Sequence, residues 1–232
     1  MTLLAIILGF LPGLVWLFFY LKEDLHPEPK RMIALVFFMG LVSAFVALVA
    51  ERFINQNVPQ SILQLVAPIS IYQGFYLLVL ALVEELTKFG AAYFSVHKNP
   101  NFDEPVDAMI YMVVAGLGFA TLENLGAISG ASIPGQTAIL SNIFTTTSLR
   151  FVGATLLHSL TSGLIGYYWA TGIRKFEVKR YIFRGLAFAT ILHAFFNYLI
   201  IDYGNMVYIV LFLVVVGFFV LNDFERLKGK RV

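Results

Sequence analysis

The chain has 232 residues, of which 59% are hydrophobic and only 13% are charged, and its mean hydropathy is +0.82. A soluble domain is about half apolar and about a quarter charged, so this chain cannot cover its own surface with polar groups. The composition indicates an integral membrane protein and excludes nucleic-acid-binding modules, soluble cofactor domains and long disordered tails. Cysteine is absent, which excludes disulfides, thiolate nucleophiles and Cys-ligated metal sites.

Apolar runs, separated by charged, Pro-containing or Gly-containing segments, follow one another along the chain. Seven such runs lie at about 2–21, 32–50, 70–96, 106–127, 150–173, 183–201 and 205–221. The first run lacks the basic leader and the cleavage site of a signal peptide, so we expect a retained anchor. A spanning helix needs about 20 apolar residues, and none of the runs alternates like a barrel strand. The expected fold is all-α: a polytopic membrane helix bundle of about seven transmembrane helices, forming a single domain over residues 1–232.

The positions of the basic residues predict the orientation of this bundle. With the N-terminus outside, thirteen of the 16 Lys and Arg residues lie on the cytoplasmic side. Arg52 and Arg150 lie on the opposite side, and Lys88 lies inside a run. This bias satisfies the positive-inside rule. We therefore expect an outside N-terminus and a cytoplasmic C-terminus.

Two long, semi-apolar segments, 51–69 and 128–149, separate runs on the predicted outer side. In the first segment, Ser61 and Gln64 have the spacing of a helix capping box. Semi-apolar segments of this kind are typical of chains that lie in the membrane interface. We expect both segments to lie along the outer surface of the bilayer.

Four of the predicted spans carry polar side chains that an apolar helix should exclude. These are Glu84, Glu85 and Lys88 in the third run, Glu123 and Asn124 in the fourth, His158 in the fifth, and His193 and Asn197 in the sixth. Each charged group at the bilayer centre costs at least about 2.5 kcal/mol on insertion scales. At about 1.5 Å per residue, the carboxylates and imidazoles lie roughly 18–27 Å from the cytoplasmic face. We therefore expect one intramembrane site, between the midplane and the outer leaflet.

The spacing within two of these runs favours hydrolytic chemistry. Lys88 is four residues from Glu84 and three from Glu85, so its ammonium can reach either carboxylate. Two adjacent carboxylates do not ionise easily together, so one of them is expected to exchange protons with water. His193 and Asn197 share one helix face and offer donors to a developing oxyanion. Together these groups can hydrolyse an amide.

Other roles for the same residues stay open. Glu85, Glu123, His158 and His193 would form a metal site, since two His and a carboxylate are an accepted zinc set. Each group alone is more often a structural helix–helix contact, although a purely structural role for the whole set is less favoured. A proton-coupled or ion-coupled transporter would use the same Glu and His cluster, but inverted repeats that favour it are not evident. A catalytically silent scaffold is the last alternative.

Four motifs occur in the order Glu84-Glu85-x-x-Lys88, Phe119-x-x-x-Glu123-Asn124, His158 and His193-x-x-x-Asn197. This order, which covers residues 70–201, resembles the PrsW family of bacterial intramembrane proteases, related to the CAAX prenyl protease and Abi superfamily. The resemblance implies a multi-pass endopeptidase of the bacterial plasma membrane. Its substrate would be a single-pass membrane protein, in some members an anti-sigma factor, cut near the extracytoplasmic side.

The resemblance also implies roles for the site residues. Glu84 and Glu85 look like the base and its neighbour, and His193 and Asn197 look like the groups that bind water and stabilise the oxyanion. Glu123, His158, Lys88 and Asn124 would complete or support the site. Glu123 stands where the CAAX proteases have a histidine, and the PrsW family has been discussed both as metal-dependent and as glutamate-type. A glutamate-activated water and a divalent metal such as zinc therefore both remain open.

Overall fold

Every element that the structure describes is helical. The computed structural model describes residues 3–22, 26–57, 69–131 and 139–228. Their helices are α1 (Leu3–Tyr20), α2 (Lys30–Asn57), α4 (Ile69–Val96), α5 (Asp107–Ala131), α6 (Ile139–Val152), α7 (Ala154–Arg174), α8 (Val178–Tyr198), a π-helical turn η1 (Leu199–Tyr203) and α9 (Met206–Lys228). The predicted all-α bundle is therefore confirmed for the described part of the chain.

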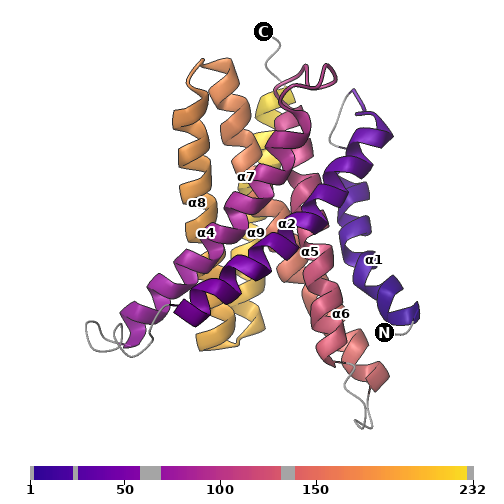
Figure 1. Cartoon of the computed structure of the whole chain (residues 1–232), viewed down its shortest axis with the longest axis vertical. Helices are drawn as coiled ribbons and strands as arrows, with labels where there is room; N and C mark the ends of the chain where they lie inside the picture. The colour runs from indigo at the N-terminus through magenta and orange to yellow at the C-terminus, as the bar shows by residue number, and fades with distance from the viewer. Residues whose placement is uncertain (1–2, 23–25, 58–68, 132–138, 229–232) are drawn as a thin grey trace.

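Five of these helices, α1, α2, α5, α8 with η1, and α9, are long and apolar enough to cross a membrane. The helices α4 and α7 are not in this set: α4 carries three charged residues in its middle, and α7 carries His158 among Ser and Thr residues. Both nevertheless pack inside the same bundle as the five. The helix α1 begins at the end of the bundle opposite to the one at which α9 ends (Figure 1). An odd number of crossings has this property.

The predicted boundaries on the outer side differ from the observed helices. The helix α2 continues to Asn57, into the segment expected to be a surface loop, and the capping box at Ser61 and Gln64 lies outside the described residues. Residues 139–152 form the separate helix α6, which packs against α1, α5 and α7. The helix is interrupted at Gly153, which separates α6 from α7. The fifth span of the prediction, which began at Arg150, therefore joins the end of α6 to α7.

The helix α5 is the centre of the bundle. In its apolar segment 83% of the residues are buried, against 33% in α1 and in α9. Glycines allow its neighbours to approach closely: a Cβ on Gly118 would lie 3.0 Å from the carbonyl carbon of Phe37 and 3.2 Å from the Cα of Gly40 on α2. On the α7 side, a Cβ on Gly116 would lie 2.8 Å from the carbonyl oxygen of His158. Small residues thus set the distance between α5 and the helices around it.

We expect Gly118→Val to destabilise the bundle by about 1–3 kcal/mol or more, because its branched side chain would meet the α2 backbone, which cannot rotate away. The measurement is thermal unfolding of the purified protein in detergent. Gly130→Val, on the same helix, is the control, since a Cβ there would have no atom within 4 Å. Equal melting temperatures for the two variants would contradict the close approach of α2 and α5.

Candidate active site

Four helices bring most of the predicted polar residues into one buried group. The helix α4 packs against α5, α7 and α8, and these four helices carry all of the predicted site residues. Of the predicted site residues, six have at most 8% of their surface exposed: Glu84, Glu85, Lys88, Asn124, His158 and His193. The fold therefore holds these charged and polar groups away from solvent and lipid. In the interior of the bundle they interact mainly with one another.

Glu85 lies between Lys88 and His193. Lys88 Nζ donates to Glu85 Oε1 at 2.7 Å, and His193 Nδ1 lies 2.7 Å from the same oxygen. Because this carboxylate oxygen accepts both contacts, the hydrogen-bond network assigns the neutral-ring proton of His193 to Nδ1. The Nε2 atom then carries the lone pair, 3.6 Å from Glu84 Oε2. A carboxylate that orients an imidazole in this way is typical of histidines that bind metals.

The second imidazole is fixed from both sides. His158 Nδ1 lies 3.1 Å from Lys88 Nζ, and because an ammonium can only donate, Nδ1 accepts this hydrogen bond. His158 Nε2 therefore donates to Glu123 Oε2 at 2.8 Å. Arg150 on α6 donates to the same oxygen at 3.0 Å and to Asn124 Oδ1 at 2.5 Å. One continuous hydrogen-bond network thus runs from α4 through α7 to α5 and α6.

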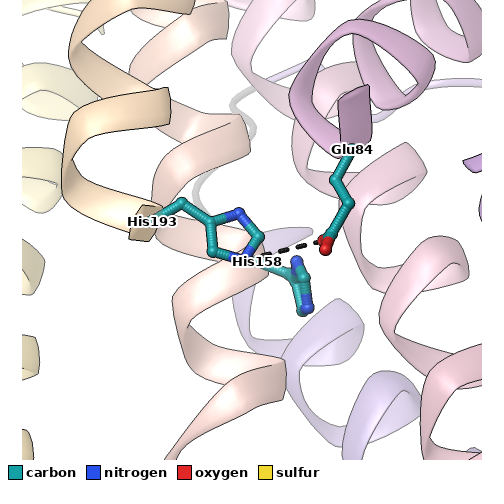
Figure 2. A group of neighbouring side chains, drawn as sticks. All are labelled: Glu84, His158 and His193. Carbon is teal, nitrogen blue, oxygen red and sulfur yellow. Dashed lines mark ion pairs between the residues drawn. The ribbon is translucent and has the colours of Figure 1, made fainter. Parts of the chain in front are cut away.

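Glu84, His158 and His193 form a group that could hold a metal ion, with one ligand atom from each within 4.8 Å of the others. Figure 2 shows their side chains converging from α4, α7 and α8. Glu84 Oε2 is buried and has no hydrogen-bond partner among the described residues. This group differs from the predicted ligand set, which had Glu85 and Glu123 in place of Glu84. Glu85 and Glu123 are held by other side chains instead: Glu85 Oε1 contacts Lys88 and His193, and Glu123 Oε2 contacts Arg150 and His158.

Asn197 is the predicted site residue that the structure does not bring into the network. It lies one turn after His193 at the end of α8, and its side chain is half-buried. It makes no side-chain hydrogen bond to the described residues. Its expected role as an oxyanion donor therefore stays a prediction.

Two charged residues near the site were not predicted to belong to it. Glu51 on α2 interacts electrostatically with Glu84 and Glu123. Arg150, assigned from the sequence to a helix mouth, binds Glu123 directly. Glu51, Glu123 and Arg150 also line one cavity beside the network. Extending the helical periodicity of the second run beyond residue 50 would have placed Glu51 on the face of α2 that carries Ala44 and Ala47.

The sequence is similar to those of known membrane proteases. Residues 28–221 match the model of a family described as "PrsW family intramembrane metalloprotease". The chain is 28% identical to the Protease PrsW of Geobacillus kaustophilus (strain HTA426), over 95% of this chain and 91% of that protein. It is 26% identical to the Protease PrsW of Bacillus subtilis (strain 168), over 95% and 94% of the two chains.

A third relative, the Protease PrsW of Clostridioides difficile (strain 630), is 26% identical over 88% of this chain and 82% of its own length. No solved structure matches the chain. The family model covers far more than half of the sequence, including every residue of the buried network. The chain therefore belongs to the PrsW family of intramembrane proteases.

Proposed function

We propose that this protease hydrolyses a peptide bond of a single-pass membrane protein, near its extracytoplasmic side, and that Glu84 is the base that accepts the proton of the attacking water. The observation that carries the proposal is that Glu84 Oε2 is buried without a hydrogen-bond partner among the described residues and, unlike the equally unpartnered Glu85 Oε2, belongs to a residue grouped with two imidazoles. A buried polar atom without a partner costs stability, and it persists where chemistry needs it. An anti-sigma factor is the first class of natural substrate to test.

The residues of the site fit a divalent metal. Glu84 Oε2 and His193 Nε2 are available as ligands, and His158 would join them by exchanging its contact with Lys88 or Glu123. Among the described residues, the network also has more acids than basic partners, since Glu51, Glu84, Glu85 and Glu123 lie near Lys88 and Arg150 alone. Zinc is the proposed ion, because two imidazoles and a carboxylate are a common zinc set. When bound, such an ion polarises the scissile carbonyl and increases the acidity of a water.

The chain's own residues would carry out the proton transfers. Glu84 accepts a proton from the attacking water and returns it to the leaving amine. Glu85 and Lys88 hold the ring of His193 in place, so that its Nε2 faces Glu84. Asn197, one turn from His193, would donate to the oxygen of the scissile carbonyl in the transition state.

Metal removal tests this proposal. We expect a membrane-permeant zinc chelator to reduce cleavage of a single-pass reporter in reconstituted liposomes to background, and added zinc to restore it. The reason is that the ion would supply the positive charge that polarises the scissile carbonyl, and the carboxylate and imidazoles that would hold it cannot supply that charge themselves. Gel analysis of the reporter measures the cleavage. Cleavage at the full rate after complete metal removal would exclude the metal and leave the glutamate-type mechanism.

We also propose that the chain crosses the plasma membrane of a bacterium seven times, with the N-terminus outside. The absence of cysteine allows a direct test, because single cysteines can be labelled without background. We expect an impermeant maleimide to label Asn205→Cys in intact cells, and to label Phe176→Cys only after the membrane is opened. Both positions are exposed. Labelling of Phe176→Cys in intact cells would contradict the proposed orientation.

A further inference from the structure

A cavity of about 310 Å³ lies next to the buried network, between α2, α5 and α6. Its walls are mostly apolar: Ala44 and Leu48 line it from α2, and Leu122 and Gly126 line it from α5. Residues 44, 47, 48 and 51 recur at helical spacing and form one face of α2, and residues 119, 122, 123, 126 and 127 form one face of α5. The cavity therefore follows from how the two helices face each other.

One wall of the cavity is part of the candidate active site. Glu123 lines the cavity and accepts a hydrogen bond from His158 at 2.8 Å. Arg150 lines it as well, and is held by Glu123 at 3.0 Å. A group bound in the cavity is thus separated from the Glu84, His158 and His193 group by a single carboxylate. This position suits a part of the substrate close to the bond that is cut.

We propose that this cavity is the specificity pocket of the protease, and that it receives a large apolar side chain of the substrate residue beside the scissile bond. This inference rests on the proposed function. The volume is at the lower end of the range of about 300–1,000 Å³ for ligand sites, which suits one large side chain with its backbone better than a separate cofactor. Arg150 is already paired with Glu123 at 3.0 Å, so an acidic side chain would find no free positive charge among the residues that line the pocket.

Gly126 controls the size of the pocket. A Cβ added to Gly126 would have no atom within 4 Å, so a side chain there enters open space without moving the backbone. Gly130 lies one turn later on α5, has the same free space around its Cβ, and does not line the cavity. Gly126→Leu and Gly130→Leu are therefore a matched pair: the same residue type changes on the same helix, and only one of the two positions lines the pocket.

The test uses a single-pass reporter that the wild-type protein cuts in liposomes, with the cut located by mass spectrometry. The residues on each side of the cut are replaced in turn by Ala, Leu, Phe and Glu. We expect the wild type to cut reporters with Leu or Phe at one of these positions faster than the Ala reporter, by roughly tenfold or more, and the Glu reporter slowest. Gly126→Leu should reverse the order of Phe and Ala, and Gly130→Leu should keep the wild-type order.

The pocket proposal would be wrong if Gly126→Leu cut the four reporters in the same order of rates as the wild type. It would also be wrong if the wild type cut all four reporters at equal rates at both positions. If Gly126→Leu cuts no reporter, Gly126→Ala decides, because its single methyl should slow the Phe reporter more than the Ala reporter. Equal slowing of the two would also overturn the pocket. Failure of the proposed function gives a different result, since the wild type would then cut no reporter at all.

Discussion

We expect Glu84→Gln to lower reporter cleavage at least a hundredfold and to leave the melting temperature close to that of the wild type. General acid–base catalysis by a positioned carboxylate contributes about 10²–10⁴-fold to a rate, and glutamine has the shape of glutamate but cannot accept the proton of water. Stability should change little, because Glu84 Oε2 makes no hydrogen bond to the described residues that the amide would lose. Liposome cleavage and thermal unfolding measure the two effects.

The control for this substitution is Glu177→Gln. Glu177 lies between α7 and α8, and its side chain is 45% exposed. It pairs with Arg180 at 3.0 Å, and this ion pair includes no residue of the buried network. An exposed pair of this kind contributes little to stability. Glu177→Gln should therefore cleave at the wild-type rate. If Glu84→Gln does the same, Glu84 is neither the base nor a necessary metal ligand.

The zinc content of the same variants separates two roles of Glu84. If Glu84 is a ligand, purified Glu84→Gln should retain less zinc than the wild type, because an amide oxygen is a weaker ligand than a carboxylate. If Glu84 is only the base, zinc binding should be unchanged while cleavage is lost. Metal analysis of the two proteins at equal concentration distinguishes these results.

The sequence was sufficient to locate the centre of the buried network. Glu84, Glu85, Lys88, His158 and His193 stand in apolar runs, where a charged or polar side chain is costly and therefore conspicuous. Their common depth followed from the helical rise alone, and the structure brings all five into direct contact. The helical class of the fold followed from the same runs, since a lipid-facing backbone must satisfy its own hydrogen bonds.

The sequence was not sufficient to assign the partners of each carboxylate. Adjacent residues on a helix point about 100° apart, so the choice between Glu84 and Glu85 as the available ligand depends on the rotation of α4 against α8. That rotation is a property of packing. Glu51 and Arg150 were missed for another reason: apolar runs do not reveal where a helix ends, and α2 and α6 extend through segments that composition assigns to the membrane surface.

Lys88 connects the two halves of the network, and it is the residue whose loss should destabilise the protein most. Its ammonium is fully buried, donates to Glu85 at 2.7 Å, contacts His158 at 3.1 Å and lies 5.2 Å from the ring centre of Phe119. We expect Lys88→Met to reduce stability by about 3–5 kcal/mol, because removing one partner leaves a buried carboxylate without its countercharge. Cleavage should be lost together with stability, since His158 and Glu85 lose the group that orients them.

A second variant separates these two losses. Lys88→Met combined with Glu85→Gln removes both charges of the buried pair, so that neither charge is left buried without its partner. We therefore expect the double variant to unfold near the wild-type temperature and still to cut no reporter, because its neutral amide orients His193 less strongly than the carboxylate does. If Lys88→Met alone is as stable as the wild type, Lys88 and Glu85 do not form a buried pair of opposite charges. If the double variant cuts reporters normally, Lys88 and Glu85 serve only the fold, and the orientation of His193 must come from elsewhere.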